Sequence, residues 1–335
     1  MDGAERAEGM AWPPRTLVIV NPVAGHRRGA AVWRHAEPAL RAAAPDLELQ
    51  TTTMPGHAEA LAAEWEQAHP HGLLLVVGGD GTVHEVVNGL LRDGSTTTLL
   101  GLVPAGTGDD FARCTGTPLD PKAAVERLSG FLQCSTGATT REETATGTTF
   151  RVDLGRLRFR EPGGNARSRV FLNSVSLGLA PRGNRLARAM GRVVPGRLRY
   201  PMGGMAALLA GTPERYRVTE QGVVRFEGEA LNLTIANGPT FGGGLRISPA
   251  SLLTDGVLEQ VIIGRLSLVR ALTALARLYG GTHVAMRGVS VDPVRGALTI
   301  ENEAAVLLAE ADGQELEAAG GLTVEPMPGA LTLLA

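Results

Sequence analysis

The alternation of two sequence patterns over residues 15–130 is what most limits the fold of this chain. Short apolar runs alternate there with segments whose apolar residues recur at helical spacing. The runs that we predict to be strands are Thr16–Val20, Leu47–Thr52, Leu73–Val77 and Leu99–Val103. The segments that we predict to be helices are Ala30–Ala43, Ala58–Ala68 and Val83–Leu91. Strands that are apolar throughout and separated by helices predict an α/β domain with a parallel sheet covered on both faces.

The pattern changes after about residue 136, where strand-like segments follow one another with few helices between them. These segments are Phe150–Phe159, Arg169–Leu177, Tyr216–Phe226, Ala230–Ala236, Val257–Ile263 and Val289–Val294. Strands broken by Gly, Pro and Asn predict an antiparallel β-sandwich. One clear helix starts after Ser267, and we expect its shared apolar face to pack in the core. The residues of that face are Leu268, Leu272, Leu275 and Tyr279.

Length and composition set further bounds. A chain of 335 residues suits two domains, which we place at 15–135 and 136–319, with residues 1–14 disordered. The net charge of −2 argues against a general nucleic-acid-binding protein. Cys114 and Cys134 are too few for a disulfide framework, and their spacing is not that of a metal site. Without a signal peptide or a run of about 18 apolar residues, we expect a cytoplasmic protein with no transmembrane span.

Three loops follow strand ends in the predicted parallel sheet, where such sheets bind ligands. They are Asn21–Gly25, Gly78–Thr82 and Pro104–Asp110. A glycine-rich turn that enters a helix exposes backbone N–H groups, which can bind phosphate. Asp80 would repel phosphate, so an acid there indicates a bound Mg²⁺ or a hydroxyl that must lose its proton. The alternative for Gly78–Thr82 is an ordinary tight turn that caps a helix.

At these residues the chain resembles the diacylglycerol kinase catalytic family, which also holds the sphingosine kinases and bacterial lipid kinases. The matching stretches are Asn21–Gly25, Gly78–Leu90, Pro104–Arg113, Phe171–Gly178, Ser248–Leu258 and Asp312-Gly313. NAD kinases and phosphofructokinases share the G-G-D-G-T core, but the longer match is more specific. The resemblance implies a nucleotide domain of that kind, a C-terminal β-sandwich and an active site in the cleft between them. It also implies that residues 320–335 return to the first domain.

The resemblance further implies an ATP- and Mg²⁺-dependent kinase acting on a hydroxyl of diacylglycerol, a sphingoid base or a related lipid. The residues expected around ATP are Asn21, Pro22, Gly25, Thr52, Gly78, Gly79, Asp80, Gly81, Thr82, Val83, His84, Gly106 and Thr107. Asp80, Asp110 and Asp153 are expected to hold Mg²⁺. A separate structural Mg²⁺ is expected at Asp255, completed by the main-chain carbonyls of Leu252 and Val257. The alternatives are a solvated helix face for His84 and a simple hairpin turn for Asp255.

The chain departs from the family pattern in two places. The family usually has Asn where this chain has Asp109. The family's D-G-E, whose Glu is the proposed base, reads Asp312-Gly313-Gln314 here, and a glutamine cannot accept that proton. Glu315 would point to the opposite face of a strand, so Asp80 could serve as the base instead. A soluble-substrate kinase of the NAD kinase type and a catalytically degenerate lipid-binding protein therefore stay as alternatives.

The arginine-rich stretch Arg182–Arg199 is the best sequence candidate for a membrane surface. Arg185, Arg188 and Arg192 share one helical face, and an apolar segment follows. Arginines beside an apolar helix fit peripheral docking on anionic lipid, the expected location of the substrate. The alternative is a solvated helix packed on the sandwich. Arg113 is a candidate for phosphate binding or for a structural pair, and the sequence also allows a homodimer through a sheet edge.

Overall fold

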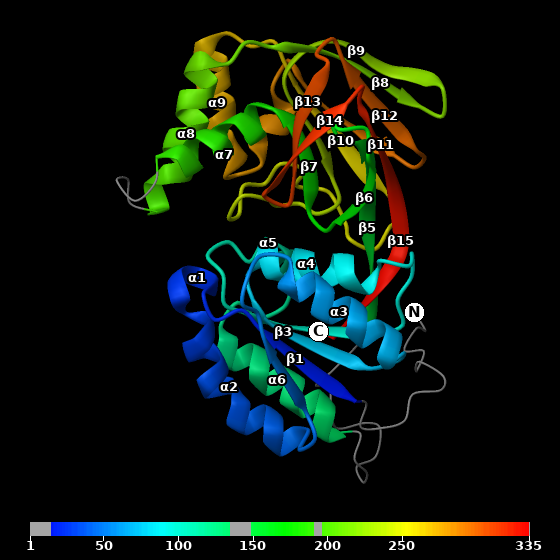
Figure 1. Ribbon diagram of the computed structural model, residues 1–335. Helices are drawn as coiled ribbons and strands as arrows, with labels where there is room; N and C mark the ends of the chain where they lie inside the picture. The colour runs from blue at the N-terminus through cyan, green and yellow to red at the C-terminus, as the bar shows by residue number, and fades with distance from the viewer. Residues whose placement is uncertain (1–14, 135–148, 191–195, 335) are drawn as a thin grey trace. The chain divides into compact units, whose positions relative to one another are not determined.

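The computed structural model describes residues 15–134, 149–190 and 196–334, which form two compact units (Figure 1). Contacts between residues assign two stretches of the chain to the first unit, one up to Val152 and one from Gly329 onward. The second unit is Asp153–Pro328. Residues 1–14 and the predicted boundary at 135–136 lie outside the described residues.

The first unit contains a parallel sheet in the order β2-β1-β3-β4-β15. Its strands are β1 (Thr16–Val20), β2 (Glu48–Thr51), β3 (Leu73–Gly78), β4 (Leu99–Pro104) and the end of β15 (Leu322–Leu334). Every residue of β1, β3 and β4 is buried, because helices cover both faces of the sheet. Thr332 and Leu333 of β15 pair with Leu99 and Leu100, so the end of the chain completes this sheet.

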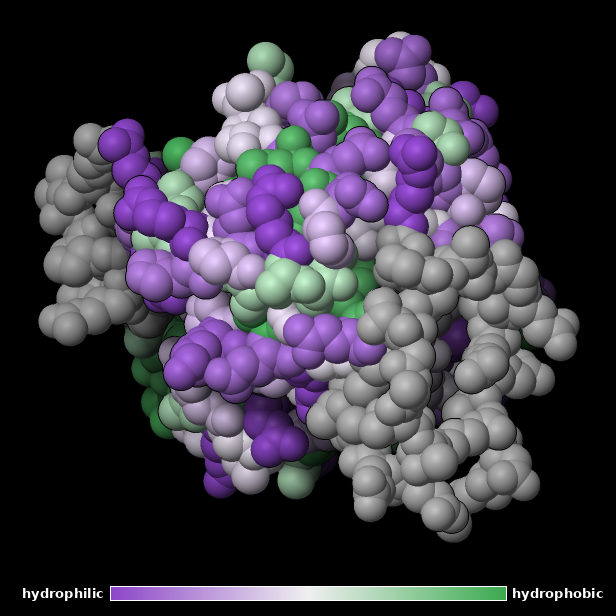
Figure 2. Space-filling view, turned by 90° about the horizontal axis from the view of Figure 1, so that it is seen from below, coloured by the Kyte–Doolittle hydropathy of each residue, from purple (hydrophilic) through white to green (hydrophobic). Residues whose placement is uncertain are grey.

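Two pairs of helices cover the two faces of this sheet (Figure 1). The helices α2 (Gly29–Ala43) and α6 (Pro121–Cys134) form one pair, and α3 (His57–Ala68) and α4 (Asp80–Leu90) form the other. Trp33 and Leu40 of α2 pack with Leu128 of α6 against the strands. Seen from the side on which α2 and α6 lie, the surface is mostly hydrophilic, as amphipathic helices require (Figure 2).

The second unit is an antiparallel β domain. Its sheet runs β14-β13-β7-β9-β8-β12-β15, with β10 and β11 continuing from β9 and with β5 and β6 continuing from β15. The bounds are β5 (Thr149–Arg160), β6 (Ala166–Phe171), β7 (Ser174–Gly178), β8 (Glu214–Glu220), β9 (Val223–Ala236), β10 (Leu258–Gly264), β11 (Val289–Val294), β12 (Leu298–Asn302), β13 (Val306–Ala311) and β14 (Gln314–Ala319). Both predicted architectures, parallel α/β and antiparallel β, are confirmed.

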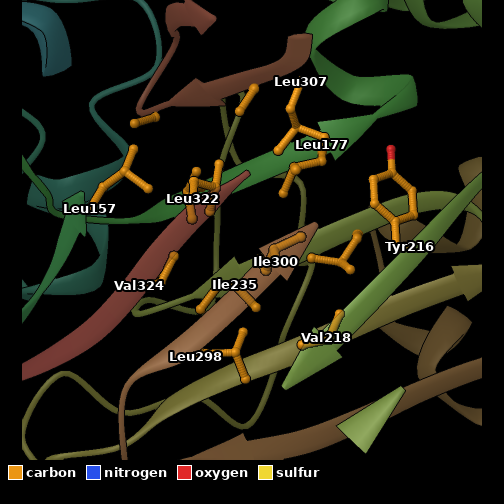
Figure 3. Packing of buried hydrophobic residues seen from close by; sticks show 14 of the residues in the cluster. Leu157, Leu177, Tyr216, Val218, Ile235, Leu298, Ile300, Leu307, Leu322 and Val324 are labelled. Atoms are coloured by element: carbon orange, nitrogen blue, oxygen red, sulfur yellow. The ribbon is translucent and has the colours of Figure 1, made fainter. Parts of the chain in front are cut away.

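The core of the second unit gathers side chains from strands far apart in the sequence (Figure 3). Leu177 of β7, Ile235 of β9 and Ile300 of β12 point toward one another there. Tyr216 of β8 lies at the edge of this cluster, and its hydroxyl donates to Glu214 Oε2 at 2.8 Å. The phenol is thereby removed from water, and burial raises its pKa.

Two of the strands predicted for this unit each correspond to two shorter strands in the structure. Arg169–Leu177 is in fact two strands, β6 and β7, because the chain turns between them at Leu172 and Asn173. Tyr216–Phe226 is a hairpin of β8 and β9. Its turn residues Gln221 and Gly222 both have positive φ, 50° and 83°, the conformation that a tight two-residue hairpin needs.

Three helices and a short 3₁₀ turn complete the second unit: α7 (Leu179–Ala189), α8 (Gly196–Ala210), α9 (Leu268–Leu278) and Thr282–Ala285. The predicted core face of α9 was partly wrong. Leu272 and Leu275 are half-buried and pack against core clusters as expected, whereas Leu268 and Tyr279 are exposed. The residues that α9 buries fully are Ala271, Ala274 and Leu278, because small side chains let the helix backbone approach its neighbours closely. None of the described helices is long and apolar enough to cross a bilayer.

Candidate active site

The three predicted loops meet at the carboxyl edge of the parallel sheet. Asn21 donates from Nδ2 to the hydroxyl of Thr82 at 2.9 Å, which joins the first loop to the second. Gly25, in the left-handed region with φ 55°, lies against the third loop. A Cβ placed on Gly25 would be 2.1 Å from the carbonyl oxygen of Ala105. Only glycine allows this contact, so the sequence pattern around Gly25 follows directly from the packing.

The second and third loops also touch through glycines. A Cβ on Gly79 would lie 2.8 Å from the Cα of Gly106, and a Cβ on Gly106 would lie 2.7 Å from the Cα of Gly79. Two backbones therefore run against each other where α4 begins. Main-chain N–H groups at such a helix start are suited to bind anionic oxygens.

Asp80 is the first residue of α4, where a carboxylate stabilises the helix by its position at the positive end of the dipole. Its Oδ1 also accepts a hydrogen bond from the backbone N–H of Phe111 at 3.1 Å. That bond ties the loop around residue 80 to α5 (Asp110–Cys114) and brings the segment that carries the buried Asp110 beside Asp80. Two carboxylates on adjoining segments are a ligand set that fits Mg²⁺.

Asp109 precedes α5 and has φ 49°, a left-handed conformation that Asp and Asn tolerate better than most residues. Its Oδ1 accepts from the N–H of Gly106 at 3.0 Å, a bond that an Asn could accept equally. Burial raises the pKa of Asp109, and Asp110 adds to the rise. The Gly106 N–H and the positive charges of Arg28 and Arg113 oppose it.

Arg113 follows Asp110 on α5. Its guanidinium donates to the carbonyl of Gly108 at 3.2 Å, so it supports the third loop. Arg28, which the sequence reading overlooked, acts electrostatically on Asp109 from the start of α2. The signal for it was present, because it belongs to a basic run directly after the first loop.

The structure excludes the solvated-face alternative for His84, since this residue is buried within α4. Thr52 directly follows β2, and its N–H donates to the carbonyl of Val20 at 2.9 Å, so it lies at the same edge of the sheet. The remaining residues expected around ATP lie on the same loops or at the start of α4: Pro22, Gly78, Gly81, Val83 and Thr107.

In the second unit, Asp312 forms the turn between β13 and β14 with Gly313. The φ values of 46° and 81° mark a tight hairpin of the kind that D-G favours. The Asp312 carboxylate accepts three backbone hydrogen bonds from the turn between β6 and β7. The donors are the N–H groups of Leu172, Asn173 and Ser174, at 2.7, 2.9 and 3.1 Å. Asp312 thus fixes a turn that lies far away in the sequence.

The same end of this β domain also holds Asp153. Asn237, which is fully buried, donates from Nδ2 to the carbonyl oxygens of Asp153 and Leu172 at 2.8 and 2.6 Å. The Asp153 carboxylate in turn accepts from the N–H of Gly256 at 2.6 Å. One chain of hydrogen bonds therefore joins Asp312, the β6–β7 turn, Asn237, Asp153 and the loop before β10.

The loop before β10 contains the predicted structural metal site. Asp255 is exposed and its Oδ1 accepts from the N–H of Val257 at 3.1 Å. The strands β9 and β10 are antiparallel neighbours, but the whole segment 237–257 lies between them, so Asp255-Gly256 is not the tight two-residue hairpin that the alternative required. Among the described residues, no group of three or more His, Cys, Asp or Glu side chains could hold a metal. A Mg²⁺ at Asp255 would need main-chain carbonyls such as those of Leu252 and Val257, which a hard cation accepts.

Gln314 is exposed at the start of β14. The next residue, Glu315, accepts hydrogen bonds from Arg185 and Arg188 of α7, and these arginines lower the pKa of its carboxyl. Two of the arginines predicted to face a membrane are thus paired inside the domain. Arg192, the third, lies outside the described residues.

Sequence reasoning missed two further residues of the second unit. Asn237 opens the segment N-G-P-T-F-G-G-G after β9, and a glycine run at a strand end was the signal that could have found it. Glu310 of β13 is buried and accepts from Asn184 Nδ2 at 2.6 Å. Burial raises the pKa of Glu310, and nothing in its local sequence showed that it would lie beneath α7.

A parallel α/β domain with three glycine loops at one sheet edge, followed by an antiparallel β domain, is the architecture of diacylglycerol kinases and NAD kinases. Residues 15–135 match the diacylglycerol kinase catalytic domain, and residues 173–335 match the YegS C-terminal NAD kinase beta sandwich-like domain. The chain belongs to the diacylglycerol kinase catalytic family, which confirms the predicted family and fold class.

Individual relatives agree with this assignment. A "Probable lipid kinase YegS-like" of Pseudomonas aeruginosa is 31% identical over 246 residues, which cover 71% of this chain and 70% of the relative. A diacylglycerol kinase of Bacillus anthracis str. Sterne is similar in structure, with a TM-score of 0.66, 21% identity and coverage of 96% of both chains. Yeast NADH kinase shares the fold at a TM-score of 0.55 and 13% identity, covering 97% of this chain and 84% of its own.

Proposed function

We propose that this protein is an ATP- and Mg²⁺-dependent lipid kinase. It transfers the γ-phosphoryl group to a hydroxyl of diacylglycerol, a sphingoid base or a related lipid. The observation that carries the proposal is the meeting of three glycine loops at the start of α4, where Gly79 lies against Gly106. The lipid kinase names of the curated relatives support the lipid substrate class.

Main-chain N–H groups of the second loop and of the first turn of α4 bind the phosphates in this proposal. Gly79 and Gly106 leave the backbone without side chains that would hold a phosphate away. Arg28 and Arg113 bring positive charge to the same loops. The chain therefore neutralises phosphate charge with arginines and backbone dipoles rather than with the lysine of a P-loop.

Asp80 and Asp110 of the first unit would hold Mg²⁺. Asp153, which belongs to the second unit, is a further predicted ligand of the same ion. Bound Mg²⁺ supplies neutralisation of the charge that develops on the transferred phosphoryl group. Asp255 with the carbonyls of Leu252 and Val257 stays a proposed structural Mg²⁺ site. The carboxylates of Asp80, Asp153 and Asp255 each accept a hydrogen bond from a backbone N–H group, which fixes their position within their own unit.

We assign acceptance of the lipid hydroxyl proton to Asp80, because Gln314 cannot act as a base. Asp312 contributes by position: its three backbone hydrogen bonds fix the β6–β7 turn. Phosphoryl transfer tolerates this arrangement, since it depends more on positioning and charge neutralisation than on strong base catalysis.

The deciding experiment is a phosphorylation screen with radiolabelled ATP and Mg²⁺ against a lipid extract and, separately, against NAD. We expect label in a lipid product and none in NADP. The likeness to yeast NADH kinase makes the soluble-substrate kinase a second candidate. Labelled NADP without labelled lipid would establish that candidate, and no labelled product with either acceptor would contradict both.

Variants at Gln314 test the degenerate, lipid-binding alternative. With Asp80 as the base, Gln314→Ala and Gln314→Glu should both stay within about threefold of the wild-type rate, since a true general base contributes about 10²–10⁴-fold. A large gain with Gln314→Glu would instead show that the wild-type protein is impaired at this position. Lipid phosphorylation by the wild type at catalytic turnover would exclude the degenerate alternative.

A further inference from the structure

The outward side of α9 is unusually apolar for an exposed helix. The exposed fractions are 50% for Leu268, 74% for Val269 and 62% for Tyr279. At 100° per residue these three side chains lie within about a third of the helix circumference, and Leu272, which lies between them, is half-buried and packs on the core cluster that holds Ala271. The opposite side carries Ala271, Ala274 and Leu278, which are buried.

The neighbouring helix extends this apolar surface. Leu208 of α8 packs in one cluster with Ala271 of α9, so the two helices are in contact (Figure 1). The next residue, Leu209, is 64% exposed, and Met205 one turn earlier is also exposed. Exposed apolar side chains from two adjacent helices form a patch, which single scattered residues do not.

Only positive charge surrounds this patch in the sequence. No Asp or Glu occurs between Glu259 and Asp292, a segment that includes all of α9. Arg270 and Arg277 are exposed as well, and at 100° per residue they lie about 80–100° beyond Val269, on the other side of it from Leu268 and Tyr279. Within the described part of the chain, no ion pair or side-chain hydrogen bond involves either of them.

The arginines of α7 differ in this respect. Arg185 and Arg188 are held by Glu315, and Arg182 is held by Glu214. Their charge is largely offset within the domain, although they were the membrane candidates of the sequence. The positive charge that stands beside an exposed apolar surface is therefore that of α9.

We propose that the outward face of α9, made by Leu268, Val269, Arg270, Arg277 and Tyr279, docks the protein on a bilayer that contains anionic lipid. Apolar side chains enter the interfacial region while the arginines meet lipid phosphates. A second copy of the chain fits this face less well. A twofold contact would bury Arg270 and Arg277 of both copies, and α9 offers no acid to pair with them. The proposed lipid kinase activity gives a reason for membrane docking, but docking itself requires neither ATP nor catalysis.

The test is flotation of the full chain with phosphatidylcholine vesicles that contain or lack phosphatidylglycerol. The wild type should bind the anionic vesicles, and Val269→Glu should lower its partition coefficient more than about tenfold. The matched control is Val223→Glu, since Val223 is a comparably exposed valine (65%) of the same unit, opposite Glu220 in the β8–β9 hairpin. It should bind as the wild type does. Arg270→Gln with Arg277→Gln should lower binding to anionic vesicles about tenfold or more.

All these positions are exposed, so thermal melting should stay unchanged and show that each variant folds. Equal binding by Val269→Glu and the wild type, or equal loss with Val223→Glu, would overturn the docking face. So would a wild-type dimer that Val269→Glu dissociates, if the wild type also fails to bind vesicles. The outcome is separable from the kinase proposal. The expected binding pattern without lipid phosphorylation would reject the kinase and keep the docking face.

Discussion

Asp80 and Asp312 each stand beside glycine in a tight turn, but their partners lie at very different distances along the chain. Asp80 accepts from Phe111, 31 residues away, on a neighbouring β–α unit of the same sheet. Asp312 accepts from Leu172, 140 residues earlier, and from the two residues that follow it. The first turn belongs to the ligand edge of a parallel sheet, and the second cross-links an antiparallel domain. Changes at the first should therefore affect chemistry, and changes at the second should affect stability.

The largest effect is expected for Asp80→Asn, which keeps an oxygen to accept from Phe111 but removes the charge. Lipid phosphorylation should fall by about 10²–10³-fold or more, because the metal ligand and the proton acceptor are lost together. The melting temperature should change little. Asp93→Asn, at an exposed acid after α4, is the control and should be fully active. An active Asp80→Asn enzyme would contradict the assignment of the Asp80 turn to the chemistry.

Asp312→Ala should destabilise the protein by about 3 kcal/mol, since three buried N–H groups would lose a charged acceptor. Urea denaturation measures this change. Asp255→Ala is the contrast, because the exposed Asp255 accepts a single local bond and should cost much less. If Asp312→Ala were as stable as Asp255→Ala, the carboxylate would not be the structural cross-link that we describe.

Gly79→Ala tests the close approach of the two loops in the first unit. A methyl 2.8 Å from the Cα of Gly106 forces the backbones apart, at a cost of about 1–3 kcal/mol, and should raise the KM for ATP. Gly163→Ala is a suitable control, since nothing lies within 4 Å of an added Cβ there. Unchanged ATP affinity in a folded Gly79→Ala protein would show that this contact does not shape the nucleotide site.

The smallest effect is expected for Asp109→Asn. Burial raises the pKa of Asp109 in the folded state above that of an unfolded aspartate, so ionisation costs folding stability as the pH rises past the unfolded pKa. The variant should match the wild type in acid and melt at a higher temperature near neutral pH. The difference should level off above the folded-state pKa. A melting difference that is constant from pH 4 to pH 8 would contradict this account.

Local sequence predicted the first unit well because its evidence is local. The predicted strand Leu73–Val77 is β3 to within one residue, and the three glycine loops do converge at one sheet edge. Continuous apolar strands and glycine at strand ends report backbone requirements that a short segment shows by itself. Helix α9 was predicted in the right place by the same kind of evidence, namely a helical period between Ser267 and Gly280.

The errors concern partners. The predicted core face of α9 included Leu268 and Tyr279, but these two are exposed, and the fully buried residues are Ala271, Ala274 and Leu278. The arginines of α7 were the sequence candidate for a lipid surface, with a helix packed on the sandwich as the alternative, and Arg185 and Arg188 pair with Glu315, 130 and 127 residues away. Neither the buried face of α9 nor the partners of the α7 arginines could be predicted from the neighbouring sequence, because both depend on side chains that are distant in the chain.

The sequence by itself determined the order of strands and helices, the glycine loops and the family, since these depend on periodicity and on backbone conformations specific to glycine. Only the tertiary structure decided that Asp312 braces a distant turn, that Glu315 neutralises two arginines and that α9 shows an apolar face to solvent. Hydrogen bonds, ion pairs and burial are relations between residues far apart in the chain, and folding alone brings those residues together.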